Sequence, residues 1–287
     1  MQIKQPPMIG LGTWKSTTDS VYCAVKHALT NGCRHLDCAP IYMNEKPVGR
    51  AIQDSISSSG IQRKDLWITS KLWNSFHAYH DAIDALKQTL HFMQLDYLDS
   101  FLIHWPVAMK KSVGHARAKS ASDFISLKDI TLEETWQALI DCQKMGLTRT
   151  IGVSNFSQSK IETISLATGI QPFINQVECH PLLSQQPLLN YCQENNILFT
   201  AYSPLGSGDR PAPLKQANEP SLLQHPLINK IATQHNASNA QVLLAWGLSR
   251  NTIVIPKSTQ AAHIDSNLAG IHLSLTEKNI KEIDTLN

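Results

Sequence analysis

"HLDCAPIY", residues 35–42, combines a short apolar run with two chemically active side chains. Asp37 ends the run, and Tyr42 follows five residues later. A carboxylate at the end of a buried strand is costly unless a cation or a hydrogen-bond donor satisfies it. Asp37 therefore predicts a partner elsewhere in the chain, at the end of another strand.

Seven further apolar runs, most of them rich in β-branched residues, resemble the one that precedes Asp37. Helix-like stretches of about 10–15 residues separate them, and this alternation predicts right-handed crossovers and a parallel sheet. Eight such units in 287 residues fit a closed (β/α)8 barrel, the TIM barrel, better than an open sheet. The expected strands are residues 8–13, 33–37, 66–71, 100–105, 150–154, 173–178, 198–203 and 252–256.

The helices between these strands carry their own start and stop signals. In residues 20–32 an apolar stripe is followed by Asn31 and Gly32, a pair typical of a helix end. In residues 131–146 a threonine cap is followed by Glu134 at the third position, and Gly146 closes the segment. Both segments therefore predict amphipathic helices that pack on the outside of the sheet.

The chain contains no linker composition, charge block or low-complexity tract, so we expect a single barrel domain over residues 1–287. Residues 106–130 and 204–224 are polar and too long for tight turns. Each follows an expected strand. We therefore expect both to be elaborated loops on the C-terminal face, where barrel active sites form.

Composition narrows the class of protein. The hydrophobic fraction is 42%, the charged fraction 17% and the formal net charge +2, which favours neither nucleic acid nor an anionic membrane as partner. The sequence contains no apolar run of signal-peptide length at its start and no membrane-spanning run of about eighteen residues. Six cysteines without a C-x-x-C pair suggest reduced thiols of a cytoplasmic protein.

Polar residues at strand ends identify a candidate catalytic group. Lys71 ends the third expected strand and is the partner that Asp37 needs, and His104 ends the fourth. A tyrosine has an ordinary pKa of ~10, and we expect Lys71 to lower the pKa of Tyr42 while Asp37 orients the lysine. A neutral His104 imidazole could align a carbonyl group.

We expect no metal site. His77 and His80 lie three residues apart, but no third ligand is evident, and we expect a solvated helix face.

Seven motifs in order along nearly the whole chain resemble the aldo-keto reductase family, in its aldehyde/aldose reductase branch. They are "HLDCAPIYMNEKPVG", "ITSKLW", "FLIHWP", "IGVSNF", "NQVECHP", "TAYSPLGS" and "VIPKS". The resemblance implies NADPH-dependent reduction of aldehydes, with ketones as an open alternative, by a metal-free monomer that acts on a small carbonyl substrate.

The resemblance also implies residue roles. Tyr42 would be the general acid, tuned by Asp37 and Lys71, with His104 orienting the carbonyl. Cofactor contacts would come from Thr13, Trp14, Lys15, Asp37, Ser154, Asn155, Gln176, Tyr202, Ser203, Leu205, Ser207, Asp209, Lys257, Ser258, Thr259, His263 and Asn267. The substrate pocket would be lined by Trp14, Tyr42, Trp73, His104 and Trp105.

Two positions depart from the family pattern. His263 stands where the family has an arginine near the 2′-phosphate, and Ser266 stands where it has an acidic residue. Because arginine presents a planar fork that histidine lacks, we expect a narrower preference for NADPH over NADH than is usual. Ala212 and the end of the chain at Asn287 lead us to expect a wide, less discriminating pocket.

Two other functions remain open from the sequence. One is a cofactor-binding regulatory or structural barrel without physiological turnover. The other is a barrel hydrolase or isomerase that uses "IPKS" as a phosphate grip, although no carboxylate pair or metal ligands support it.

Overall fold

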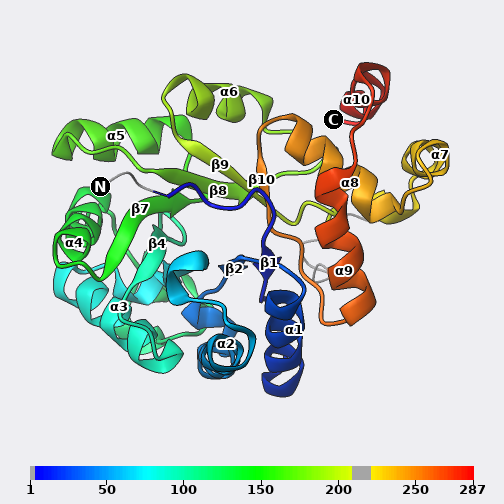
Figure 1. Cartoon of the computed structure of the whole chain (residues 1–287). Coiled ribbons are helices and arrows are strands. Elements are labelled where there is room, and N and C mark those ends of the chain that lie inside the picture. Colours follow the sequence, from blue (N-terminus) through cyan, green and yellow to red (C-terminus); the bar gives the residue numbers. More distant parts are fainter. Residues whose placement is uncertain (1–3, 209–220) are drawn as a thin grey trace.

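A computed structural model describes residues 4–208 and 221–287 and shows eight parallel strands in one curled sheet (Figure 1). Parallel bridges from Ile9 to Val254 and from Gly12 to Lys257 join the last strand to the first. The sheet therefore closes into the expected (β/α)8 barrel. The strands, in their order around it, are β1 (Leu11–Gly12), β2 (His35–Asp37), β3 (Trp67–Leu72), β4 (Leu98–Ile103), β7 (Thr148–Ser154), β8 (Ile174–Glu178), β9 (Leu198–Tyr202) and β10 (Ile253–Val254).

Helices surround the sheet, and the described part of the chain has none that is both long and apolar enough to cross a membrane. They are α1 (Thr18–Thr30), α2 (Glu45–Ser59), α3 (Tyr79–Met93), α4 (Leu132–Lys144), α5 (Gln158–Thr168), α6 (Gln186–Glu194), α7 (Pro226–Gln234), α8 (Asn239–Ser249), α9 (Ala261–Ala269) and α10 (Glu277–Asp284). Their buried apolar side chains join those of the strands in one large core, in which α7 packs on α8 and α10 packs on α7.

The cap predicted for α4 is present in part. The Thr131 hydroxyl accepts a hydrogen bond from the Glu134 N–H at 3.1 Å, as expected of an N-cap. The Glu134 carboxylate does not close the reciprocal bond; it accepts the N–H of Tyr79 at the start of α3 instead (3.0 Å). The helix ends before Gly146, which has a φ of +77°. The same carboxylate thus joins the starts of two neighbouring helices.

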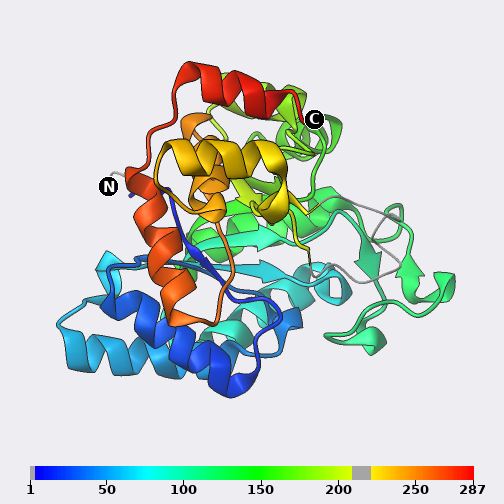
Figure 2. The ribbon, with the colours of Figure 1, turned by 90° about the vertical axis from the view of Figure 1, so that its right-hand side faces the viewer.

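The loop of residues 106–130, expected on the catalytic face, contains a small hairpin. Its strands are β5 (Ala108–Met109) and β6 (Phe124–Ile125), paired antiparallel. Figure 2 shows this segment, in green, projecting to one side of the barrel. The second expected loop, 204–224, lies largely outside the described residues, and so does its Ala212.

Candidate active site

The four expected catalytic residues meet at one end of the barrel. Asp37 is the last residue of β2, Lys71 lies near the end of β3 and His104 directly follows β4. Tyr42 ends a short 3-10 turn, Pro40–Tyr42, in the loop after β2. The strands are parallel, so their carboxyl ends share one rim, and the chain brings all four side chains to it.

Lys71 is the partner that Asp37 requires. Its Nζ donates to Asp37 Oδ1 at 2.5 Å, to the Cys38 carbonyl at 3.1 Å and to the Tyr42 hydroxyl at 3.4 Å. Both members of the ion pair are almost fully buried. Burial alone would lower the pKa of Lys71, but Asp37 and Tyr42 together raise it above its ordinary value. The lysine is therefore charged throughout the neutral range.

The second oxygen of Asp37 has a partner that the residue pattern did not reveal. Gln176, on β8 across the barrel, donates from Nε2 to Asp37 Oδ2 at 2.7 Å. An ionised carboxylate only accepts hydrogen bonds, so the amide nitrogen must face it. Gln176 was expected only as a cofactor residue, and in the structure it also helps to satisfy the buried carboxylate.

We expected Lys71 to lower the pKa of Tyr42, but in the structure the net shift of this pKa is upward. Burial of the hydroxyl raises the pKa of Tyr42 to about 12, and the opposing influence of Lys71 is smaller. Lys71 lowers the pKa of Tyr42, as predicted. However, removal from water destabilises the phenolate by more than the lysine charge stabilises it. Tyr42 therefore carries its proton at all neutral pH values.

His104 is a neutral imidazole in this site. Burial, and secondarily the charge of Lys71, holds its pKa well below the usual range. Its Nδ1 atom is buried and has no hydrogen-bond partner among the described residues. Its ring meets Tyr42 edge to face at a centroid distance of 6.1 Å and Trp73 at 5.3 Å.

Aromatic side chains line the mouth beside these groups. The Trp14 ring lies 6.4 Å from the Tyr42 ring, and Trp73 Nε1 donates to the Ala116 carbonyl at 3.0 Å. Trp73 thereby fastens the loop 106–130 to the site. Trp105, the third expected wall residue, is 40% exposed and makes no ring contact with Tyr42, His104 or Trp73.

The residues expected at the nicotinamide end lie at the ends of β7, β8 and β9. Asn155 donates from Nδ2 to the His104 carbonyl at 2.9 Å and accepts from the Tyr202 hydroxyl at 2.8 Å. Its φ of +62° lies in the left-handed region, which asparagine adopts more readily than most side-chain-bearing residues. Ser154 is buried beside it. These contacts tie the expected cofactor residues to the expected substrate residue His104.

The turn after β9 has a similar backbone. Ser203 and Ser207 both have positive φ values, +50° and +43°, and the Ser207 hydroxyl donates to Ser203 at 2.6 Å. Leu205 is half-buried between them. Asp209, expected to contact the cofactor, lies outside the described residues.

The expected phosphate end follows β10. Lys257 is exposed, and Ser258 and Thr259 are half-buried. The Ser258 hydroxyl accepts a hydrogen bond from the N–H of Gln260, the residue just before α9, at 3.1 Å. Anions bind favourably at helix starts because the free N–H groups point toward them. His263 lies exposed on the first turn of α9.

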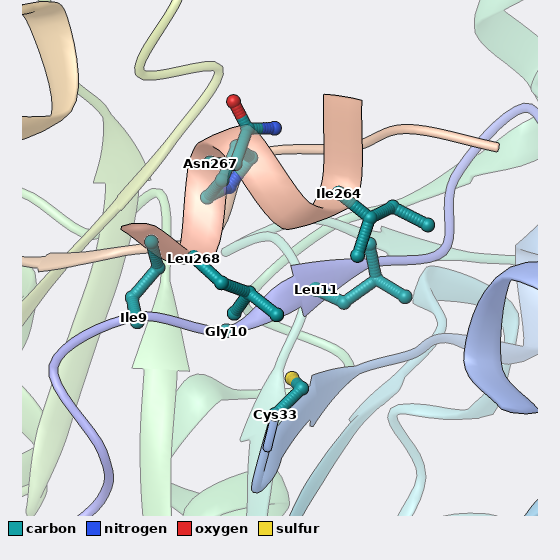
Figure 3. Close-up of a pocket in the computed structure, with 8 residues that line it drawn as sticks. Ile9, Gly10, Leu11, Cys33, Ile264, Asn267 and Leu268 are labelled. Carbon is teal, nitrogen blue, oxygen red and sulfur yellow. The ribbon is translucent and has the colours of Figure 1, made fainter. Parts of the chain in front are cut away.

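Asn267, further along α9, borders a small cavity together with Ile9, Leu11, Cys33 and others (Figure 3). The cavity has a volume of about 10 Å³, room for no more than one water molecule, so it is not a cofactor site. The amide of Asn267 points away from Leu11 and Cys33 in this view, toward the other side of α9.

The expectation of a solvated His77 is wrong. His77 precedes α3, is only 1% exposed, and finds no hydrogen-bond partner for either ring nitrogen among the described residues. His80 alone is exposed. The described residues contain no group of three or more side chains able to hold a metal ion.

Two buried polar residues beside the site were missed by the sequence reasoning. Asn44 and Glu45 follow Tyr42 closely, and both are buried. Their position directly after Tyr42 was the one available signal in the sequence. The spacing did not indicate that these two polar side chains point into the protein.

Comparisons with known proteins agree with this geometry. The sequence profile of the Aldo/keto reductase family matches residues 8–287. An aldo/keto reductase of Synechocystis sp. is 46% identical over 99% of this chain and 86% of its own length. Aldo-keto reductase family 1 member A1 of Sus scrofa is 41% identical over 98% and 86%.

The structure also matches a solved protein. The aldose reductase from Schistosoma japonicum superposes with a TM-score of 0.87 and 35% identity, over 98% of this chain and 89% of that one. The chain therefore belongs to the aldo/keto reductase family, oxidoreductases that reduce carbonyl compounds with a nicotinamide cofactor.

Proposed function

We propose that this chain, as one barrel domain over residues 1–287, is an NADPH-dependent reductase of aldehydes, with Tyr42 as the general acid. Ketones remain an open second substrate class. The observation that carries the proposal is the contact of Lys71 with both Asp37 and the Tyr42 hydroxyl, beside a neutral His104. Membership of the family supports carbonyl reduction in general, and the named residues supply the proposed detail.

In the proposed reaction each of the four side chains has a separate role. His104 donates an N–H to the carbonyl oxygen and so aligns the substrate beneath Tyr42. Bound NADPH would supply a hydride to the carbonyl carbon. The carbonyl oxygen gains the Tyr42 proton as the C=O double bond becomes a single bond, and Tyr42 recovers a proton from solvent. Lys71 stabilises the transient phenolate, and Asp37 holds Lys71 in place.

The high pKa of Tyr42, about 12, is compatible with this role. A donor with that pKa is fully protonated at neutral pH. The oxygen that develops during hydride transfer is an alkoxide, a stronger base than a phenolate, so the proton moves downhill. When the proton leaves, Lys71 at 3.4 Å is the nearest charge that can compensate the phenolate.

The cofactor residues are proposals of the same kind. Ser154, Asn155 and Gln176 present amide and hydroxyl groups suited to a carboxamide, and Tyr202 offers a ring face for stacking. The proposed 2′-phosphate site is the start of α9, where N–H groups and a cation would meet the phosphate. Its residues either precede the helix or lie in its first turn: Lys257, Ser258, Thr259 and His263. The other proposed contacts among the described residues are Thr13, Trp14, Lys15, Asp37, Ser203, Leu205, Ser207 and Asn267.

The aromatic rings of Trp14 and Trp73 favour substrates with an apolar body over highly hydroxylated ones. Similarity to the aldose reductase from Schistosoma japonicum is consistent with an aldehyde as the reacting group. A regulatory barrel without turnover is less well supported, because all four catalytic side chains are present and in contact distance.

Loss of NADPH absorbance, measured with aromatic aldehydes, aliphatic aldehydes, sugars and ketones, tests the proposal. We expect turnover with the aldehydes, and slower turnover with NADH in place of NADPH. Tight NADPH binding without turnover of any substrate would support the regulatory barrel instead. Absence of both binding and turnover would contradict the proposed function.

A further inference from the structure

Asn44 closes a turn that belongs to a different part of the barrel rim. Its side chain is only 1% exposed, and its Nδ2 donates to the carbonyls of Thr13 at 2.9 Å and Ser16 at 3.2 Å. These are the first and last residues of the turn that leaves β1. One amide group therefore spans both ends of the turn.

This turn touches the catalytic group on two sides. The Thr13 N–H and hydroxyl donate to the Asp37 carbonyl at 3.1 Å and 2.8 Å. The next residue, Trp14, places its ring 6.4 Å from the ring of Tyr42. A shift of the turn would therefore move the wall that faces the proton donor.

The conformation of the turn needs stabilising contacts from residues outside the turn. Lys15 adopts a φ of +53°, a left-handed conformation that is strained for a residue with a β-carbon. Strained backbone persists only where the surroundings over-determine it. Asn44, two residues after Tyr42, supplies two of the contacts that do so and links the turn to the Tyr42 loop.

We propose that Asn44 is a positioning residue that holds the turn Thr13–Ser16 closed, and with it the Trp14 ring against Tyr42. The proposal rests on the proposed function, because it concerns the geometry of that reaction. Asn44 acts through the turn, because both hydrogen bonds of its amide nitrogen go to backbone carbonyls of the turn. Loss of its donors leaves two carbonyls without these bonds and releases the strain at Lys15.

Asn44→Asp is the sharpest test, since aspartate has nearly the same shape but cannot donate when ionised. Asn44→Ala removes the group, and Asn44→Ser, a single donor, should fall between wild type and the other two. The matched control is Asn279→Ala, because Asn279 is also buried and hydrogen-bonded but lies on α10. A second readout is the emission of Trp14, isolated by subtracting the spectrum of the corresponding Trp14→Phe protein.

We expect Asn44→Asp and Asn44→Ala to lower kcat/KM for an aromatic aldehyde by about tenfold or more, the size of a lost buried hydrogen-bond pair. Trp14 emission should shift to longer wavelength as the ring gains water contact, in protein that circular dichroism shows to be folded. Asn279→Ala should lower Tm while it leaves both readouts unchanged.

Wild-type kcat/KM and unchanged Trp14 emission in Asn44→Asp would overturn the proposal. So would a loss of activity that only follows the unfolded fraction, with unchanged emission in the folded protein. If the wild-type protein turns over no carbonyl compound, the proposed function fails, and the emission measurement still decides whether Asn44 holds the turn.

Discussion

Lys71 and Asp37 form an ion pair inside the barrel, with Nζ 2.5 Å from Oδ1 and both side chains almost completely buried. Lys71→Met would leave Asp37 as an uncompensated buried charge. We expect a loss of about 3–5 kcal/mol in unfolding free energy, the size typical of breaking a buried pair.

The double variant Asp37→Asn/Lys71→Met separates stability from chemistry. It removes both charges, so urea unfolding should show that much of the lost stability returns, while turnover should stay low because no cation faces Tyr42. Recovery of turnover together with stability would contradict the role assigned to Lys71.

The contact of Asp37 with Lys71 was predictable because parallel strands place their carboxyl ends on one rim, so strand ends become neighbours. The bond from Gln176 to Asp37 crosses the barrel interior and depends on side-chain directions that spacing does not contain. The pKa of Tyr42 was misjudged for a related reason, because water exclusion depends on packing from several elements at once. His77 was expected on a helix, but the chain enters α3 only at Tyr79, and the preceding turn points the ring inward.

Glu45 should make the free energy of unfolding fall as pH rises, the opposite of what a carboxylate with a lowered pKa does. Burial raises the pKa of this carboxyl from 4.5 to about 7, while hydrogen bonds from Thr89 and Ser70 oppose the shift. Between these values the folded protein holds a proton that the unfolded chain has released, so stability falls as pH rises through this window and is flat above it. Glu45→Gln should therefore gain stability relative to wild type by up to ~1.4 kcal/mol per pH unit across the window.

Urea unfolding at about pH 5 and about pH 8 checks this expectation. Glu277→Gln is the matched control, because Glu277 also begins a helix but is exposed. An equal effect of Glu45→Gln at both pH values would show that the Glu45 carboxyl does not hold a proton in the folded state.

His77 should contribute to unfolding in acid. Burial lowers its pKa to about 3, whereas the unfolded imidazole takes up a proton near pH ~6.5. The unfolded state then binds more protons between these values, so stability is lost as pH falls through this range. His35 and His104 have lowered pKa values as well, and the difference between wild type and His77→Gln isolates the contribution of His77.

We expect His77→Gln to reduce the acid-side slope of unfolding free energy by up to ~1.4 kcal/mol per pH unit. His80→Gln, three residues away and exposed, controls for the substitution itself. Identical slopes in wild type and His77→Gln would mean that the ring reaches water or a partner in solution.

Cofactor preference should respond to His263. A guanidinium can make two parallel hydrogen bonds to a phosphate, and an imidazole can make one. We expect His263→Arg to raise the ratio of the NADH dissociation constant to the NADPH dissociation constant by roughly tenfold, which means a stronger preference for NADPH. His272→Arg, an exposed histidine beyond the end of α9, adds the same charge as a control. Equal ratios for the two variants would place His263 away from the 2′-phosphate.

The most direct test of the central claim is aldehyde-dependent oxidation of NADPH by wild type and by Tyr42→Phe, with NADPH affinity measured on the same samples. Phenylalanine keeps the ring but removes the proton that the site would deliver. We predict a fall in kcat of at least ~10²-fold, typical of the loss of a general acid, with a nearly unchanged NADPH dissociation constant. Near-normal kcat in folded Tyr42→Phe would contradict the assignment of Tyr42 as the proton donor.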